Sequence, residues 1–178
     1  NRLLEKMPFL ISKIGEAAVP LDGHEVAVRS AESNLGNFIA DQMRGAFGEP
    51  DADLAFINGG TLRIDDYISG DITFEDIGRI FGFSSLLGYL QMTGGEFRTT
   101  LEAGYRGTGQ GKGYFPQVSG FRVCVDRSRS DGQRIVQLQL PTTDGWTDID
   151  VDREYSVIAP EYLLGGGDGY RFPPHRAQ

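Results

Sequence analysis

The sequence is poor in the residues that most often hold structural metals. It has one cysteine, Cys124, and two histidines, His24 and His175. One cysteine cannot form a disulfide within the chain, and a structural zinc site needs several cysteine or histidine ligands. We expect Cys124 to be a small buried strand residue, because it lies in the alternating run 121–125. His24 lies in a polar turn beside Asp22 and Glu25, and His175 follows two prolines near the end of the chain. Metal-dependent hydrolysis needs several ligands held together, so we expect neither histidine to be a catalytic metal ligand.

Long hydrophobic runs and an excess of basic residues are missing as well. No stretch of about 18 apolar residues occurs, and we therefore expect no membrane span. The formal net charge of the chain is −8. A surface of this sign repels polyanions, which excludes duplex DNA or RNA as an expected partner. It still permits a small anionic ligand that is bound by a few arginines.

Glycine, in contrast, is abundant. The chain has 25 glycines in 178 residues, well above the usual share of about 7%. They cluster in short runs, which indicates specific turns and close backbone approaches rather than a flexible linker. The length is sufficient for one domain with a core of its own.

Apolar spacing and turn signals predict helices and strands without regular alternation. Residues 1–18 have helical spacing, and further helices are expected after the capping residues Ser33, Thr73 and Thr93. We therefore predict an α+β fold in which helices pack on a mixed β-sheet. Strands are predicted at residues 24–30, 53–57, 86–92, 120–125, 135–140 and 155–159.

Four segments place polar or aromatic side chains at the ends of predicted elements. In the first, Arg29 lies at the end of the predicted strand 24–30, ahead of the helix that Ser33 caps. An arginine close to the free backbone N–H groups of a helix start suits an anion. The alternative is a surface arginine that is paired with Glu32.

The second segment follows the predicted strand 53–57. Two glycines after Asn58 allow the backbone to approach a ligand closely. The Asn58 amide is both a donor and an acceptor, and Arg63 offers a rigid fork of donors for a carboxylate, a phosphate or a hydroxyl pair. The alternative is a tight turn that ends in a solvated arginine.

The third segment contains Phe83 between glycine and serine residues. Small neighbours leave its ring uncovered, and an uncovered ring suits stacking on a flat base. The alternative is packing in the core.

The fourth segment contains Tyr162 and a glycine run interrupted by Asp168. A carboxylate inside such a run suits hydroxyls or amines rather than a phosphate, because like charges repel. The alternative is a glycine-rich turn in which Asp168 caps a backbone N–H. Together the four segments carry two aromatic rings, two arginines, an amide and a carboxylate, which is the inventory of a nucleoside site.

These segments resemble motifs of the C-terminal, substrate-binding domain of the 5'-nucleotidase family. That family also includes UDP-sugar hydrolases and 2',3'-cyclic nucleotide phosphodiesterases. Five motifs carry the resemblance in order along the chain, namely ESNLGN at 32–37, NGGTLR at 58–63, FSS at 83–85 followed by LQMTG at 90–94, PQVSG at 116–120 and LGGGDGY at 164–170.

The resemblance implies a role for each candidate residue. Phe83 and Tyr162 would stack on the two faces of the base, and Asp168 would bind the ribose hydroxyls. The ribose and phosphate side of the substrate would be contacted by Arg29, Asn58 and Arg63. Two positions depart from the family pattern: Tyr162 replaces a common phenylalanine, and Gly165 replaces a usual asparagine, which leaves the base preference open.

The resemblance also implies a larger protein. Members carry two divalent metal ions, such as zinc or manganese, on a preceding metallophosphoesterase domain. We therefore expect residues 1–20 to be an inter-domain linker helix and residues 21–178 to be the C-terminal domain. We expect this domain to hold no cofactor and to hydrolyse nothing alone. A periplasmic or secreted location is implied by the same relatives.

Three functions fit these expectations. The first is the specificity domain of a two-domain, metal-dependent 5'-nucleotidase that hydrolyses phosphate esters of nucleotides. The second is a stand-alone nucleoside-binding module without catalysis. The third is the same scaffold recruited for a substrate that is not a nucleotide, as in the thiohydrolases of sulfur oxidation.

Overall fold

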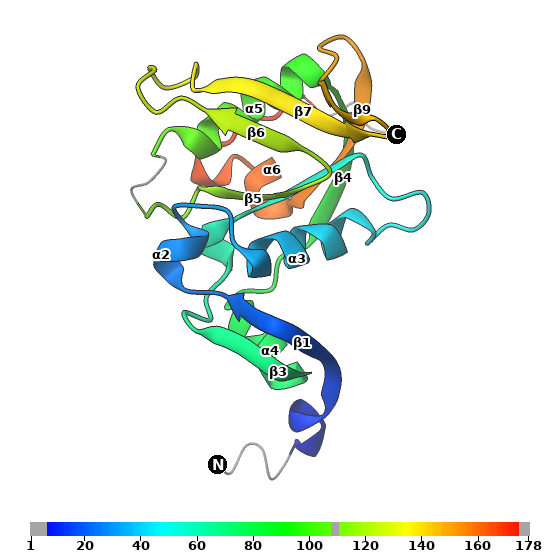
Figure 1. Ribbon diagram of the computed structural model, residues 1–178, viewed down its shortest axis with the longest axis vertical. Helices are drawn as coiled ribbons and strands as arrows, with labels where there is room; N and C mark the ends of the chain where they lie inside the picture. The colour runs from blue at the N-terminus through cyan, green and yellow to red at the C-terminus, as the bar shows by residue number, and fades with distance from the viewer. Residues whose placement is uncertain (1–6, 108–110, 175–178) are drawn as a thin grey trace.

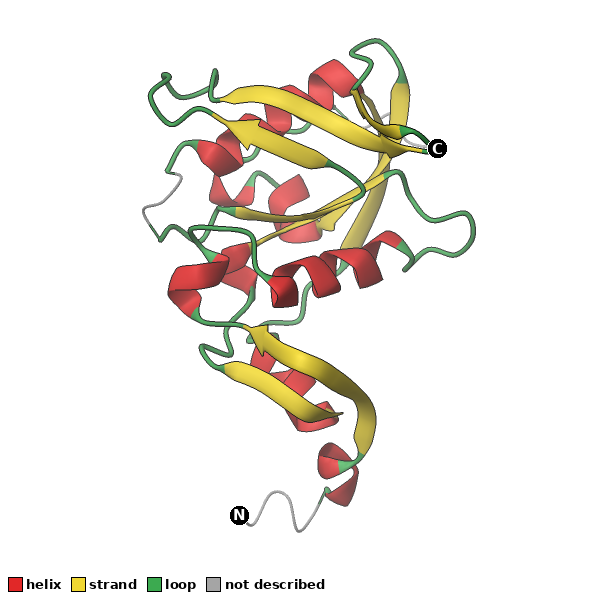
Figure 2. Ribbon diagram, in the orientation of Figure 1, coloured by secondary structure: helices red, strands yellow, loops and turns green. Residues whose placement is uncertain are grey.

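The computed structural model describes residues 7–107 and 111–174 of the chain. It confirms the predicted α+β class, with mixed sheets and a few helices. Figure 1 shows a layered body from which an arm projects toward the N-terminus. We use "arm" for the two-stranded β1–β3 sheet with its short helices η1 and α4, and "body" for the remaining described elements (Figure 2).

The body contains two sheets, of four and of three strands. The central sheet has the order β4-β9-β2-β5, in which β2 is parallel to β9 and the other pairs are antiparallel. The second sheet has the order β6-β7-β8 and is antiparallel throughout. The strand bounds are β2 Leu54–Asn58, β4 Leu87–Thr93, β5 Pro116–Ser119, β6 Arg122–Val125, β7 Ile135–Thr142, β8 Gly145–Asp148 and β9 Glu154–Pro160.

Helices complete the layers of the body and the arm. Helix α5 lies with the second sheet on one face of the central sheet, and α3 packs on the opposite face. The arm consists of η1, β1, β3 and α4. The bounds are η1 Pro8–Ile11, β1 Lys13–Asp22, α2 Glu25–Val28, α3 Asn34–Arg44, η2 Gly59–Thr61, β3 Tyr67–Thr73, α4 Phe74–Ile80, α5 Gly94–Tyr105, α6 Glu161–Leu164 and η3 Gly167–Gly169.

Strand β2 explains why the body has two hydrophobic clusters. All five of its residues are buried. Leu54 and Phe56 face the cluster under α5, whereas Ala55 and Ile57 face the cluster under α3. A strand covered on both faces is apolar at nearly every position, as this one is. The central sheet is therefore held from both sides, and its strand ends are fixed in place.

The predicted helix starts are confirmed in detail. The Ser33 hydroxyl accepts from the backbone N–H of Gly36. Thr73 and Thr93 each form a capping box, with Asp76 and with Glu96 respectively. Each box satisfies two N–H groups that a helix start would otherwise leave without a partner.

Two expectations about secondary structure are wrong, and the predicted linker helix is wrong in part. The described part of 1–18 is not a helix, because η1 is a single 3-10 turn and β1 begins at Lys13. Residues 24–30 are not a strand but contain the helical turn α2. The predicted linker helix 1–20 is therefore replaced by β1 in its second half, while residues 1–6 lie outside the described residues.

Cys124 is exposed rather than buried. It lies on β6, whose neighbours Val123 and Val125 pack against the core. Because side chains alternate along a strand, Cys124 faces the other side, opposite Gln137 of β7. The predicted strand is confirmed, but the predicted burial of Cys124 is wrong.

Candidate functional site

Four chain segments meet at one edge of the central sheet. Strands β2 and β9 are parallel, so their carboxyl ends, Asn58 and Pro160, lie at the same edge. The antiparallel neighbours begin there, since Leu87 of β4 pairs with Pro160 and Pro116 of β5 pairs with Asn58. The carboxyl edge of a sheet is where ligands bind in many α/β structures. This edge positions the loops that carry five of the six candidate residues.

Asn58 and Asp168 are brought together there although 110 residues separate them. The Asn58 Nδ2 donates to Asp168 Oδ2 at 2.7 Å, and the Thr61 hydroxyl donates to Asn58 Oδ1 at 2.7 Å. Asn58 is buried, with 3% of its surface exposed. Its amide is therefore fixed at both ends, as a buried polar group requires.

The two glycines after Asn58 permit close backbone packing. The N–H of Gly59 donates to the Phe115 carbonyl and that of Gly60 to the Gly113 carbonyl, both at 2.7 Å. A Cβ at Gly59 would lie 2.1 Å from the Val28 carbonyl oxygen, which no side chain can tolerate. The turn η2 is thus wedged between the α2 segment and the loop before β5.

Tyr162 also contacts Asp168. Its hydroxyl donates to Asp168 Oδ1 at 3.1 Å and accepts from the Asp168 N–H at 3.2 Å. The ring remains 53% exposed. The Asp168 carboxylate accepts hydrogen bonds from the side chains of Tyr162 and Asn58. The alternative prediction, in which Asp168 caps a backbone N–H, does not describe these contacts.

Phe83 is 66% exposed and does not pack in the core. The guanidinium carbon of Arg63 lies 5.5 Å from the centre of the Phe83 ring. Arg63 is held by its backbone N–H, which donates to the Ile80 carbonyl at 2.8 Å. Arg63 and Phe83 therefore form a second group of candidate residues at this edge.

The segments of Phe83 and Tyr162 are neighbours in the fold. The backbone N–H of Glu161 donates to the Leu86 carbonyl at 2.8 Å. A shallow pocket of about 390 Å³ lies between them and is lined by Leu86, Leu87, Gly88, Glu161, Leu164 and Gly165. That the two rings face each other across one base stays a prediction.

Arg29 lies apart from the Asp168 group, on the segment that follows α2. Its guanidinium pairs with Glu25 rather than with Glu32, and Glu32 instead accepts from Asn37. Arg29 is mostly buried, and its Nε has no hydrogen-bond partner among the described residues. Its backbone passes close to Gly59, since a Cβ placed on that glycine would lie 3.4 Å from the Arg29 Cα.

Gln117, in the PQVSG motif, holds the Arg29 segment in place and received no role from the sequence. It is completely buried. Its Oε1 accepts from the Ser33 N–H at 2.9 Å, and its Nε2 donates to the carbonyls of Val28 and Ala31 at 2.9 and 2.7 Å. In the sequence, the only sign of this role was that Gln117 is a polar residue inside a family motif.

Arg106 is a second residue that the sequence did not reveal. It follows α5, and its guanidinium donates to the Asp168 carbonyl at 2.6 Å and to the Ala103 carbonyl at 2.7 Å. The same group lies 3.8 Å from the centre of the Tyr114 ring. Nothing in its sequence neighbourhood points to residue 168, because 62 residues separate the two.

The end of the glycine run is anchored by Tyr170. This side chain is buried in the core, and its hydroxyl donates to the Tyr114 carbonyl at 2.7 Å. Burial raises the pKa of the Tyr170 hydroxyl well above its usual value, and nearby Tyr105 and Asp168 act in the same direction. The hydroxyl therefore stays protonated and keeps its role as a donor.

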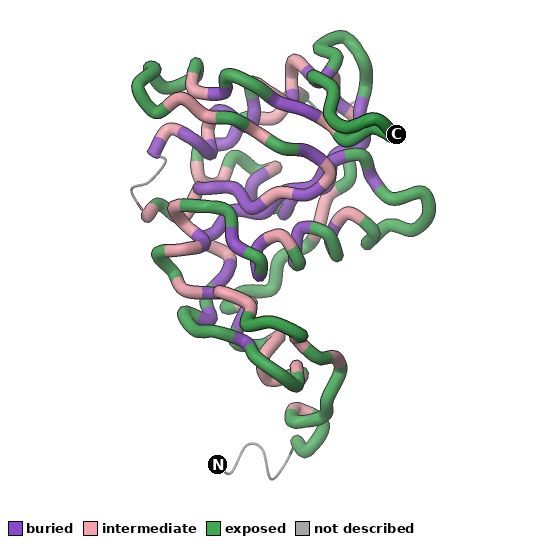
Figure 3. The backbone as a smooth tube through the Cα atoms, viewed as in Figure 1, coloured by how far each residue is buried: buried purple, intermediate pink, exposed green. Residues whose placement is uncertain are grey.

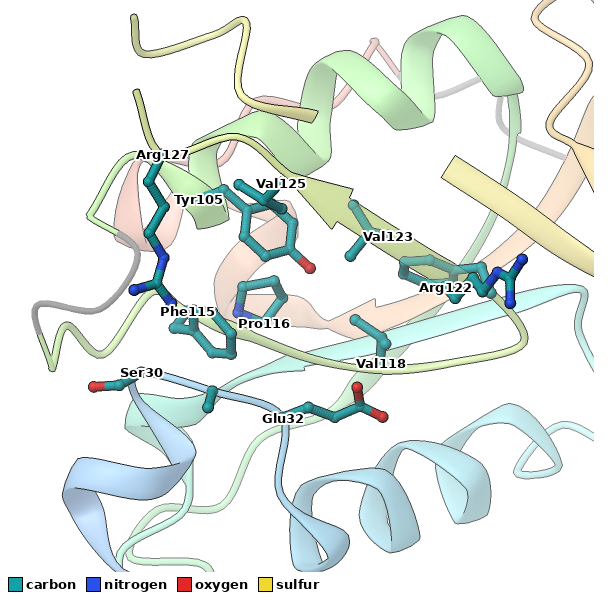
Figure 4. Close-up of a pocket in the computed structure, with 12 residues that line it drawn as sticks. Ser30, Glu32, Tyr105, Phe115, Pro116, Val118, Arg122, Val123, Val125 and Arg127 are labelled. Carbon is teal, nitrogen blue, oxygen red and sulfur yellow. The ribbon is translucent and has the colours of Figure 1, made fainter. Parts of the chain in front are cut away.

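Figure 4 shows a different pocket, of about 270 Å³, between the segment 30–32 and strand β6. Its lining is largely apolar and includes Phe115, Val118 and Val123. None of the six candidate residues lines it. The candidate site is therefore the edge around Asp168 and not this pocket.

No metal-ligand cluster is found in the described parts of the chain. Within residues 7–107 and 111–174, no three His, Cys, Asp or Glu side chains are grouped so that they could hold an ion. Over the same residues, none of the helices has the length and apolar character needed to cross a membrane.

Comparison with protein families now identifies the fold and the motifs. The family described as "5'-nucleotidase, C-terminal domain" matches residues 13–174. The chain belongs to this family. The resemblance inferred from the five motifs is thereby confirmed, and the matched range includes β1, which the sequence had assigned to a linker helix.

Known relatives agree with this assignment. A 5'-nucleotidase of Bos taurus is 32% identical over 176 residues, covering 92% of this chain and 31% of the bovine protein. A trifunctional nucleotide phosphoesterase of Bacillus subtilis is 35% identical over 162 residues, covering 89% of this chain and 11% of that protein.

Solved structures match the fold. The crystal structure of a 5'-nucleotidase precursor from Thermus thermophilus has a TM-score of 0.82 at 34% identity, covering 93% of this chain and 32% of its own. The NAD nucleotidase of Haemophilus influenzae has a TM-score of 0.78 at 26% identity, covering 93% and 31%. This 5'-nucleotidase C-terminal domain thus spans about a third of these two structures.

One departure from the family pattern is sterically free. A Cβ at Gly165 would lie 3.5 Å and 3.6 Å from the carbonyl oxygens of Glu161 and Tyr162, which are ordinary contacts. A side chain therefore fits at this position. The glycine is not required by the backbone, and an asparagine there would lie beside the shallow pocket.

Proposed function

We propose that this domain is the nucleoside-binding specificity domain of a two-domain, metal-dependent nucleotide hydrolase of the 5'-nucleotidase type. The observation that carries the proposal is the meeting of Asn58, Asp168 and Tyr162 at one edge of the central sheet. The exposed ring of Phe83 and the guanidinium of Arg63 lie at the same edge.

Each group has chemistry that suits one part of a nucleotide. Exposed rings of Phe83 and Tyr162 can stack on a base, because every base has a flat π-face. The Asp168 carboxylate can accept hydrogen bonds from ribose hydroxyls. On the phosphate side, Arg29 and Arg63 supply charge-assisted donors. Asn58 lies on the ribose side, where its amide binds the Asp168 carboxylate.

Hydrolysis in the whole protein would take place elsewhere. We propose that two divalent metal ions on a metallophosphoesterase domain activate a water and stabilise charge on phosphorus. The C-terminal domain would hold the nucleoside so that its phosphate reaches those ions, which lowers the barrier by positioning. The isolated domain is then inactive, and a periplasmic or secreted location is part of the same proposal.

Another substrate class is the main competitor on the same scaffold. A sulfate thiohydrolase from Thermus thermophilus shares the fold with a TM-score of 0.67 at 15% identity, which is a likeness of fold alone. Exposed stacking rings favour a nucleoside over a small sulfur-containing substrate, because a small anion has no face to stack on.

The test is a calorimetric titration of the purified domain with adenosine and with AMP. We expect binding without added metal, and a loss of about 5-fold to 150-fold for Phe83→Ala and for Tyr162→Ala, since stacking contributes about 1–3 kcal/mol per base. Trp146→Ala is the control, because this exposed ring lies on β8, in the second sheet. A wild-type domain that binds no nucleoside or nucleotide would refute the proposed function.

A further inference from the structure

We propose that the Tyr162 hydroxyl and the Arg106 guanidinium are positioning groups that hold Asp168 as a rigid acceptor, so that the domain selects ribose over 2'-deoxyribose. The inference rests on the proposed nucleoside-binding function. It assigns a role to the hydroxyl group of Tyr162, which the common phenylalanine lacks. It also assigns a role to Arg106, which lies outside the family motifs quoted above.

Asp168 is held at every polar atom that it has. The Tyr162 hydroxyl accepts from its N–H and donates to Oδ1, at 3.2 and 3.1 Å. Asn58 donates to Oδ2 at 2.7 Å, and Arg106 donates to the carbonyl oxygen at 2.6 Å. Three side chains from three separate segments therefore fix both the backbone and the carboxylate of one half-buried residue.

The backbone of Asp168 needs this support. Its φ of 51° and ψ of 20° lie in the left-handed region, which a residue with a side chain adopts at a cost in free energy. Such a conformation persists only where the surroundings determine it. The Asp168 N–H donates to the Tyr162 hydroxyl and the Asp168 carbonyl accepts from Arg106, and these two hydrogen bonds stabilise the conformation.

Tyr162 also packs closely against the turn that carries Asp168. A Cβ on Gly167 would lie 2.5 Å from the Tyr162 Cζ and 2.6 Å from its Cε2. The absence of a side chain at Gly167 thus allows the turn to close against the hydroxyl end of the ring. If this ring moved, it would lose its two hydrogen bonds to Asp168. The position of the ring that stacks on the base and the position of the carboxylate that binds the sugar therefore depend on each other.

Arg106 is fixed independently of Asp168. Its guanidinium lies 3.8 Å from the centre of the Tyr114 ring and also donates to the Ala103 carbonyl. A cation placed over an aromatic face and tied to a helix end has few alternative positions. It reaches Asp168 from the end of α5, a helix that packs in the core of the body (Figure 1).

A rigid carboxylate discriminates between sugars more strongly than a mobile one. A site built to bind a hydroxyl pair loses a hydrogen bond when one hydroxyl is missing. A mobile carboxylate can turn toward the remaining hydroxyl and recover part of the loss, whereas one held at both oxygens cannot. The Tyr162 hydroxyl should therefore increase the preference for ribose without contacting the sugar itself.

The experiment compares adenosine with 2'-deoxyadenosine, titrated into the wild-type domain and into Tyr162→Phe. We expect Tyr162→Phe to weaken adenosine binding by about 3-fold to 10-fold, because the variant loses the hydrogen bonds that hold the half-buried Asp168. Binding of 2'-deoxyadenosine should change by less than about 2-fold. The ribose-to-deoxyribose affinity ratio should therefore fall in the variant, while stacking is retained.

Two further variants make the result specific. Arg106→Gln should lower the same ratio, because it removes the charged donor to the Asp168 carbonyl. Tyr89→Phe is the matched control: it removes another exposed tyrosine hydroxyl, one that accepts from Gln91 and not from Asp168, and should leave the ratio unchanged. Thermal unfolding of each variant checks that the fold is intact.

The outcomes separate the two proposals. A wild-type domain that binds neither ligand refutes the proposed function itself. A wild-type domain that binds adenosine, with Tyr162→Phe giving the wild-type affinity ratio, overturns this inference and leaves the nucleoside site in place. Equal affinity of the wild-type domain for both ligands would overturn it as well.

Discussion

The body and the arm have similar local structure but very different burial. In the body, every residue of β2 is buried, and all residues of β9 except Glu154 are buried. In the arm, β1 has no buried residue, and β3 has one, Ile68. Figure 3 shows the contrast as a body with a buried interior and an arm that is exposed or half-buried along most of its length.

This difference shows what each region can do. The body holds its strand ends rigidly from two faces, so loops at the carboxyl edge of β2 and β9 can position side chains such as Asp168. A precise site needs such a scaffold. The arm is joined to the body at its base through Ile68 and Ile80. Its tip is held by strand pairing with two register shifts and by the contact between the exposed rings of Phe9 and Phe74. None of the six candidate residues lies on the arm.

The largest expected effect tests whether stability resides in the body. Phe56→Ala should lower the free energy of unfolding by about 3–5 kcal/mol, because it leaves a cavity where the ring packs against Phe97 and Tyr170. Phe9→Ala, which removes a half-exposed ring from the arm, should cost less than about 1 kcal/mol. Urea denaturation measures both. Equal losses would contradict the contrast between the two regions.

An intermediate effect is expected from the two capping boxes. Thr93→Ala removes the cap of α5 in the body and should lower the global free energy of unfolding by about 1 kcal/mol. Thr73→Ala removes the equivalent cap of α4 in the arm. It should mainly increase hydrogen exchange in α4 and β3, because the arm can open without unfolding the body.

The conservative variant Thr93→Ser keeps the capping oxygen and should retain most of the stability. If Thr73→Ala lowers the global unfolding free energy as much as Thr93→Ala does, then the arm and the body unfold as one unit. That result would remove the distinction between the two regions.

The smallest effect concerns an exposed ion pair at the base of the arm. Hydrogen bonds from Arg79 and from the Tyr67 N–H lower the pKa of Asp66. The ion pair stabilises the folded state fully when the pH is above the unfolded-state pKa of about 4. This stabilisation is lost as the pH falls through the lower folded-state pKa. Arg79→Gln should therefore raise the pKa of Asp66 toward its usual value, as measured by NMR titration.

Asp126 is the internal control for that titration. Its pKa is lowered chiefly by hydrogen bonds from Ser128, so Arg79→Gln should leave it unchanged. An Asp66 pKa that does not move in this variant would show that Arg79 is not its main partner.

Much of the body could be predicted from local sequence. The caps Ser33, Thr73 and Thr93 depend on residues three positions apart, so their signals are complete within one turn. The buried strands β2 and β9 are largely continuous apolar runs, a pattern typical of strands covered on both faces. The family motifs could be recognised for the same reason, because each is short and contiguous.

The arm could not be predicted in the same way. The apolar residues of 1–18 have helical spacing, but β1 is formed by pairing with β3, more than 40 residues away, as in Lys13 with Thr73. The segment around α2 was assigned to a strand for a similar reason: its single turn depends on the Asp65 carboxylate, which accepts from the Glu25 N–H. Such partners are invisible to local patterns.

The sequence alone determined the family, the α+β class and the candidate residues of the edge site, because short motifs and apolar runs express them locally. Only the tertiary structure decided how Asp168 is held. Its partners Asn58 and Arg106 are 110 and 62 residues away, and only the packing of β2, α5 and the final turn brings them into contact. Hydrogen bonds act over about 3 Å, so residues that are distant in the chain become partners only after the core has formed.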